Sequence, residues 1–167
     1  MTFCAAQASN LLSDLSFSTL MANVNKEDRL GSIASIIRGD PYLHSLRVRV
    51  LELEKGSAKL LLPESDRVLR HGGIVNGGAI CTLMDAAGGT ATATVNTGKN
   101  QVTIELKVNF LEPVKKGNMY CSAKVVRAGR QIVVVEMNLT DSDGKLCAMG
   151  IGTWMILRED RFPSPTR

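Results

Sequence analysis

Residues 70–95 read RHGGIVNGGAICTLMDAAGGTATATV, and this stretch decides how the rest of the chain is interpreted. On a helical wheel, Leu83, Met84 and Ala87 fall within about sixty degrees of Ile80, which predicts a helix over residues 77–94 with one apolar face. The opposite face carries a single carboxylate, Asp85, among small side chains. Those neighbours are Gly78, Thr82 and Gly89. Because their side chains are so small, another backbone or a ligand can approach Asp85 closely.

The predicted helix is rich in glycine, which is a poor helix former and costs about 1 kcal/mol per position relative to alanine. Its four glycines are Gly77, Gly78, Gly88 and Gly89. We expect close packing against neighbouring elements to offset this cost. The alternative interpretation is that part of the stretch forms a loop.

Asn76 stands directly before the helix and is a favourable N-cap residue. Its role is either capping alone or capping combined with a functional helix start. In the second case the free N–H groups of Gly77 and Gly78 lie at the positive end of the helix dipole. An unhindered glycine N–H is a suitable oxyanion donor for acyl transfer.

The spacing of Gly77 and Asp85 constrains any mechanism that uses both. They are eight residues apart, so about 12 Å of helix separates them. A water held by Asp85 and a carbonyl held by Gly77 must lie within about 3 Å of each other. Two antiparallel copies of the helix can satisfy this condition, whereas one helix cannot. If the chain is an enzyme, we therefore expect a composite active site across a two-fold dimer, with two sites per dimer.

The segments around the helix predict an α+β architecture. Residues 26–38 have apolar residues at helical spacing, and Gly39, Asp40 and Pro41 end that helix. Residues 1–25 predict a short helix or a loosely held arm. Residues 46–54 and 58–62 predict a hairpin, with a change of phase near Leu51 as at a bulge. Residues 64–76 predict a polar loop.

The last third of the chain predicts four strands in an antiparallel meander. Val102 to Phe110 alternates strictly, with apolar residues at even positions and polar residues at odd ones. Short turns then separate the runs 119–126, 131–139 and 145–157. We therefore expect an N-terminal arm and helix (1–44), a single α+β domain (45–157) and a flexible tail (158–167).

Composition excludes several classes of protein. The net charge is only +4, and aromatic residues make up 4% of the chain, too few for stacking on single-stranded nucleic acid. The four cysteines form no C-x-x-C pair and are not spaced with His44 and His71 as metal ligands. We expect no metal and a reducing, cytoplasmic location. No stretch approaches the ~20 apolar residues of a membrane span, and the N-terminus lacks the pattern of a signal peptide.

These motifs resemble the hotdog-fold thioesterases, in particular the branch of the phenylacetate-pathway and 4-hydroxybenzoyl-CoA thioesterase-like proteins. That family shows His-Gly-Gly, six residues and then an acid, and the run from Asn76 to Asp85 has this spacing with asparagine in place of histidine. The strand VTIELKVNFLEPVKKG, 102–117, is also similar. The resemblance implies an antiparallel sheet wrapped around a long central helix. It also implies a homodimer that often pairs into a homotetramer, with an acyl-CoA substrate and no separate cofactor.

By the same resemblance, Asp85 is the general base or nucleophile, the Gly77 N–H is the oxyanion donor, and Thr103 orients water or substrate. Arg70 stands where some members have an asparagine, and His71 follows it. Turn cations could bind the phosphates of CoA, notably Arg127 and Arg130, although a solvated basic turn explains them equally well.

Three functions remain open from the sequence. The first is thioester hydrolysis, for which a carboxylate and an oxyanion donor suffice because a thiolate leaves without strong acid assistance. The second is a hotdog dehydratase or hydratase, which usually needs a histidine where this chain has Asn76. The third is a non-catalytic acyl-CoA-binding protein, which the retained Asp85 argues against.

Overall fold

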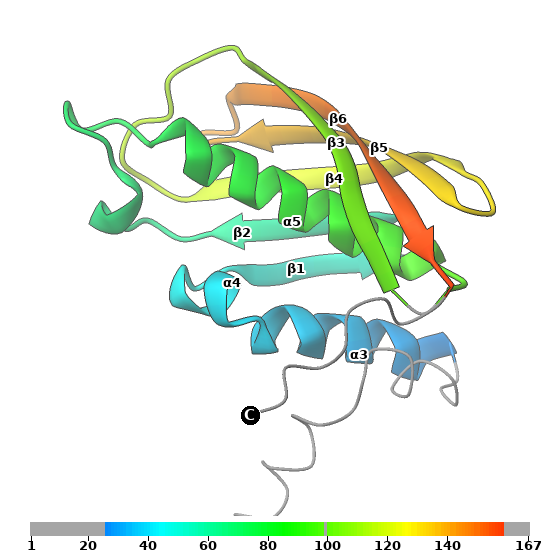
Figure 1. Ribbon diagram of the computed structural model, residues 1–167. Helices are drawn as coiled ribbons and strands as arrows, with labels where there is room; N and C mark the ends of the chain where they lie inside the picture. Colours follow the sequence, from blue (N-terminus) through cyan, green and yellow to red (C-terminus); the bar gives the residue numbers. More distant parts are fainter. Residues whose placement is uncertain (1–25, 99, 159–167) are drawn as a thin grey trace, which may run out of the picture.

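A computed structural model of the chain describes residues 26–98 and 100–158 (Figure 1). The predicted arm over residues 1–25 lies outside the described residues, as does the predicted tail beyond residue 158. None of the helices within the described ranges is both long and apolar enough to cross a membrane.

One antiparallel sheet of six strands packs against a long helix, α5 (Gly77–Val95), and this confirms the predicted α+β hotdog fold (Figure 1). The sheet has the strand order β1-β2-β4-β5-β6-β3. Its strands are β1 (Arg49–Glu54), β2 (Ser57–Leu62), β3 (Asn100–Phe110), β4 (Met119–Ala128), β5 (Ile132–Thr140) and β6 (Leu146–Leu157).

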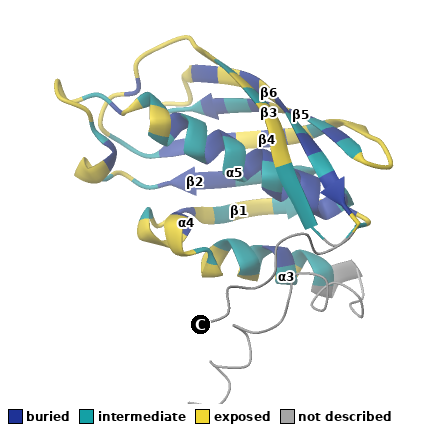
Figure 2. Cartoon of the chain, viewed as in Figure 1, coloured by how far each residue is buried: buried dark blue, intermediate teal, exposed yellow. Residues whose placement is uncertain are grey.

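The predicted core face of α5 is confirmed, since Ile80, Leu83, Met84 and Ala87 are all buried. Burial then extends around most of the helix from Ala87 to Thr94, which the wheel did not predict (Figure 2). The reason is that the curved sheet encloses the second half of α5, while the first half keeps one open flank.

Close packing explains the most buried glycine of this helix. A Cβ atom at Gly88 would lie 2.2 Å from Cη2 of Trp154 on β6 and 2.8 Å from Sδ of Met137 on β5. Only glycine allows α5 to approach the sheet to this distance. The expectation that close packing offsets the poor helix propensity of glycine is therefore confirmed at Gly88.

The predicted four-strand meander is wrong in one respect. Strands β4, β5 and β6 follow one another, but β3 pairs with β6 and not with β4. The link between β3 and β4 crosses the end of the sheet, where the N–H groups of Leu111 and Glu112 both donate to the carbonyl of Cys147. This crossing leaves β3 at one edge of the sheet.

The hairpin of β1 and β2 is confirmed, and its register shifts between Val50 and Glu52, as the phase change near Leu51 predicted. However, β1 begins at Arg49, three residues later than predicted. The preceding residues belong to a short helix, α4 (Pro41–Ser45), and to the turn that follows it. In that turn Arg47 adopts a left-handed backbone with φ 59°.

Helix α3 (Lys26–Gly39) confirms the predicted N-terminal helix. Its residue Ile33 is buried, and the Arg29 guanidinium donates hydrogen bonds to the carbonyls of Ala93 and Asn96 at the end of α5. Helix α4 was not predicted, although its signals are local. Asp40 caps it by accepting from the Leu43 N–H at 2.9 Å, and Pro41 occupies its first turn.

Candidate active site

The centre of the candidate site is a hydrogen bond between α5 and β3. The Thr103 hydroxyl donates to Oδ1 of Asp85 at 2.8 Å. Asp85 is half-buried and Thr103 is exposed, so the carboxylate is held by the protein and remains open to solvent on one side. The structure thus joins two residues that lie eighteen positions apart in the sequence.

A β-bulge makes this contact geometrically feasible. Thr103 is paired with Trp154 and Glu105 with Thr153, so Ile104 has no partner of its own. Trp154 faces α5, and its cross-strand partner Thr103 therefore faces α5 as well. Strict alternation would have placed Thr103 on the face opposite Leu106, so the strand prediction is wrong at this point. The alternation fails because the bulge adds one residue to β3, and this extra residue reverses which side chains face α5.

The start of α5 supplies a free backbone donor at Gly77. Asn76 caps the helix, and its Oδ1 accepts from the Gly78 N–H at 2.8 Å. The expectation that both glycine amides are free is therefore wrong for Gly78, because the cap uses it. Within the described chain, no acceptor is bonded to the Gly77 N–H, which is the first helical residue and has no intrahelical partner.

A cavity of about 430 Å³ opens beside Gly77. Its lining is mostly apolar and includes Ile74, Ile80 and Phe110, with Arg70 at its polar side. A Cβ atom at Gly77 would lie 3.4 Å from Cζ of Phe110, so this ring rests against the helix start. Phe110 was not singled out from the sequence, where it is only the last apolar residue of an alternating strand.

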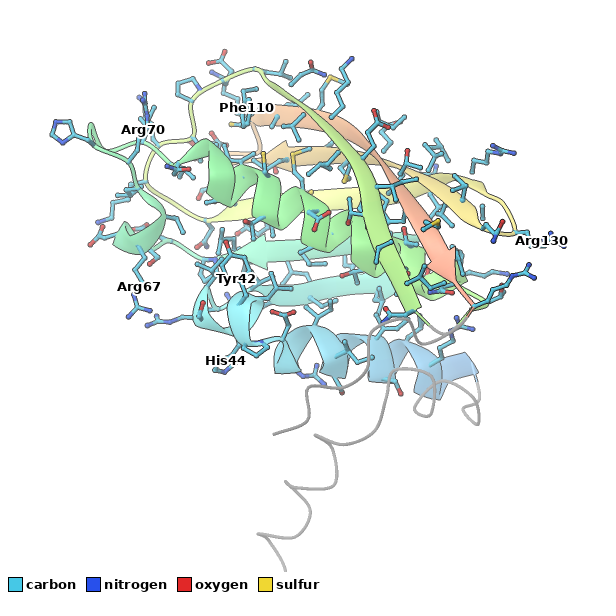
Figure 3. The ribbon with its side chains drawn as sticks, in the orientation of Figure 1. Tyr42, His44, Arg67, Arg70, Phe110 and Arg130 are labelled. Carbon is cyan, nitrogen blue, oxygen red and sulfur yellow. The ribbon has the colours of Figure 1, made fainter. Side chains whose placement is uncertain are left out.

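The remaining predicted site residues do not lie together in this chain. His71 is exposed in the turn after Arg70 and does not line the cavity. Arg127, near the end of β4, and Arg130, in the turn that follows, are both exposed. Figure 3 shows Arg130 at the opposite end of the molecule from Arg70.

The open flank of α5 has a second neighbour that the sequence did not suggest. The Tyr42 hydroxyl on α4 lies 3.2 Å from Oγ1 of Thr82, one helical turn before Asp85. Tyr42 itself is 60% exposed. Helix α4 therefore borders the candidate site, and no spacing rule connects residues so far apart in the chain.

Neither Cys81, beside Asp85 on α5, nor Cys121, in the core, is an activated nucleophile. Burial raises the pKa of the Cys81 thiol, and the negative charge of Asp85 raises it further. Burial also raises the pKa of Cys121 to about 12. Both thiols are therefore protonated at neutral pH. Over residues 26–98 and 100–158, no group of three or more His, Cys, Asp or Glu side chains could hold a metal ion.

Comparison with known proteins identifies the family to which the chain belongs. The family model described as the thioesterase superfamily matches residues 72–148. A protein of Saccharolobus solfataricus named "Putative esterase" is 44% identical over 133 residues, which is 79% of this chain and 95% of that protein.

Two solved structures share the fold. A thioesterase from Haemophilus influenzae has a TM-score of 0.71 at 20% identity, covering 80% of this chain and 94% of its own. The PaaI protein from the phenylacetic acid degradation operon of E. coli has a TM-score of 0.73 at 18% identity. The match covers 80% of this chain and 96% of that protein. Fold, matched residues and sequence identity together show that this chain belongs to the thioesterase superfamily, a family of hotdog-fold thioester hydrolases.

Proposed function

We propose that the chain hydrolyses an acyl-CoA or aryl-CoA thioester to the free acid and CoA, with Asp85 as the base or nucleophile. The observation that carries this proposal is the 2.8 Å hydrogen bond from Thr103 to Asp85. It fixes one carboxylate oxygen and leaves the second oxygen to act on water or on the substrate carbonyl. A positioned carboxylate is one of the two groups that thioester hydrolysis requires.

In the general-base form of the reaction, Asp85 takes a proton from water as the water oxygen bonds to the carbonyl carbon. The oxyanion that forms accepts a hydrogen bond from the Gly77 N–H, which has no other acceptor within the described residues. Collapse of this intermediate breaks the carbon–sulfur bond, and the thiolate leaves with the electron pair. In the nucleophilic form, a carboxylate oxygen of Asp85 bonds to the carbonyl carbon, and the carbon–sulfur bond breaks so that the thiolate leaves with the electron pair. Water then hydrolyses the resulting mixed anhydride to the free acid and regenerates Asp85.

The oxyanion donor in this proposal comes from the neighbouring subunit, because Asp85 and Gly77 of one chain are separated by about 12 Å of helix. Two features support a paired arrangement. Strand β3 is an edge strand whose outer backbone groups are available to a second copy, and its bulge residue Ile104 is 52% exposed. The cavity beside Gly77, with Phe110 in its wall, would then receive the acyl group.

The first test removes the carboxylate and its positioning bond. In an assay of thiol release over a panel of acyl-CoA thioesters, we expect Asp85→Asn to lower kcat by about 10²- to 10⁴-fold, the range for loss of a general base. Thr103→Val should lower kcat, whereas Thr103→Ser keeps the hydroxyl and should retain most activity. Unchanged turnover in Asp85→Asn would rule out the assigned role.

The second test removes only the backbone donor. Gly77 is the first residue of α5, a position where proline is favoured, and Asn76 before it has the extended backbone that proline requires. Gly77→Pro should therefore leave α5 folded while deleting the N–H, and kcat should fall by about 10²- to 10³-fold. Gly77→Ala is the matched control, because it keeps the N–H and adds a Cβ that meets only the mobile end of Phe110.

The same assay separates hydrolysis from a binding role. If no thioester of the panel releases thiol while calorimetry shows acyl-CoA bound, the chain is a non-catalytic acyl-CoA-binding protein. Equal turnover by Gly77→Pro and Gly77→Ala would show that the Gly77 amide does not bind the oxyanion.

A further inference from the structure

A second cavity, separate from the one beside Gly77, lies between α4 and the start of β1 and has a volume of about 920 Å³. We call it the α4–β1 groove. It is lined by Arg38, His44, Ser45, Arg47, Val48, Arg49 and Pro63. Three of these residues are arginines, one is a histidine, and none is an acid. This size is within the range of small-molecule sites.

The groove gathers three arginines around one concavity, and none of them forms an ion pair with another described residue. Over the described residues, the ion pairs within 4 Å are all formed by lysines: Lys59 with Glu52, Lys116 with Glu64 and Asp66, and Lys145 with Glu112. Arg38 donates to the hydroxyl of Ser35 at 2.8 Å, and neither Arg47 nor Arg49 is in an ion pair with any residue of 26–98 or 100–158. Three guanidinium groups around one concavity therefore keep donors for an anionic ligand.

The chemistry of the lining indicates which anion fits. Guanidinium groups bind phosphate oxygens through paired, charge-assisted hydrogen bonds, so three of them suit a ligand with several phosphates. Half-buried Pro63 adds an apolar surface against which a base can pack, whereas Val48, which also lines the groove, is largely buried. A nucleotide with more than one phosphate fits both features, because its phosphates can bind the guanidinium groups and its base can pack on the apolar surface.

Helix α4 connects this groove to the candidate active site. Tyr42 on α4 bonds to Thr82 on the Asp85 flank of α5, and His44, two residues further along α4, lines the groove. Figure 3 shows Tyr42 on the side of α4 nearer to α5 and His44 on its other side. One short helix therefore borders both sites.

We infer that the α4–β1 groove binds the phosphorylated nucleotide end of a CoA thioester, while the flexible pantetheine arm passes α4 to reach Asp85. This inference rests on the proposed function for the identity of the ligand. It assigns Arg38, Arg47 and Arg49 to the diphosphate and the 3′-phosphate of CoA.

The direct test is calorimetric titration of the full chain with adenosine 3′,5′-bisphosphate, with adenosine as a parallel arm. The wild type should bind the bisphosphate and not adenosine. Arg47→Gly and Arg49→Gln should each weaken binding roughly tenfold, since each removes hydrogen bonds between charged groups. Arg47→Gly is suitable because glycine adopts the φ of 59° without strain, so folding is preserved. Arg158→Gln, an exposed arginine just past β6, is the matched control and should stay within twofold.

The kinetic test compares two thioesters of the same acyl group. For acyl-CoA, the double variant Arg47→Gly/Arg49→Gln should raise KM tenfold or more with kcat retained. For the acyl-N-acetylcysteamine thioester, which has no nucleotide, kcat/KM should not change.

Each outcome decides between the two proposals. Equal affinity for the bisphosphate in wild type and double variant, or an unchanged KM for acyl-CoA, would overturn the groove assignment and leave thioester hydrolysis intact. Arginine-dependent binding of the bisphosphate without turnover of either thioester would retain the groove as a nucleotide site and overturn the proposed function.

Discussion

At the scale of single residues, Asp85 and Cys81 stand one helical turn apart on α5 and influence each other electrostatically. Burial raises the pKa of the Cys81 thiol, and the carboxylate of Asp85 raises it further, because a thiolate beside a carboxylate places two negative charges close together. Cys81 can therefore report the charge of Asp85 without any substrate.

The sign of this coupling predicts a shift in the alkylation profile of Cys81. Asp85→Asn removes one of the two influences that raise the pKa of the thiol, so the pH midpoint of alkylation should fall while remaining above that of an exposed cysteine. Mass spectrometry of iodoacetamide adducts over a pH series measures this midpoint, and Cys81→Ser identifies the adduct. Asp85→Glu keeps the charge and is the control. Identical profiles for wild type and Asp85→Asn would contradict the coupling.

At the scale of elements, the fold depends on how closely α5 approaches β6. Gly88 on the helix allows the approach, and the indole of Trp154 fills the space between the two elements. Glycine is also needed on the strand, since a Cβ at Gly152 would lie 2.6 Å from the same indole. The contact between α5 and β6 therefore depends on Gly88, Gly152 and the indole of Trp154.

This packing makes Gly88→Ala destabilising even though alanine is the better helix former. The added Cβ would lie 2.2 Å from Trp154, and overpacking of this kind typically costs about 1–3 kcal/mol. Gly31→Ala in α3 is the matched control, because nothing lies within 4 Å of its Cβ and the change should stabilise by up to about 1 kcal/mol. Urea unfolding at one fixed protein concentration measures the free energy of unfolding of both variants. Equal changes in this free energy would disprove the packing argument.

At the scale of the whole molecule, the proposed site is complete only when two chains meet. In the proposed mechanism, one subunit would supply the carboxylate held by Thr103, and its neighbour would supply the amide of Gly77. The free edge of β3 and the open flank of α5 are the surfaces such a pair would use.

A mixed dimer tests whether the site is shared. In a heterodimer of Asp85→Asn and Gly77→Pro chains, purified through two different tags, one composite site carries both defects and the other carries neither. We therefore expect about half of the wild-type activity per dimer, while each parent homodimer is inactive. A site built within one chain gives an inactive heterodimer instead. Light scattering on the wild type checks the dimer directly, and a monomer would exclude the shared site.

Local sequence patterns were sufficient to identify helices α3 and α5 and most strands, together with several of their details. Periodicity and capping predicted the helix over residues 77–94, its buried stripe, the Asn76 cap and the bulge near Leu51. All of these depend on neighbours along the chain. Asp85 and Gly77 could be selected for the same reason, since their spacing on one helix is a local property.

The contacts between these elements become visible only in the folded chain. The position of β3 beside β6, the bulge that turns Thr103 toward Asp85, and the contact of Tyr42 with Thr82 all join residues far apart in the chain. The groove arginines likewise come from α3, from the turn after α4 and from β1. Strand order and bulge position depend on which partners a strand finds, and a periodic pattern contains no information about partners.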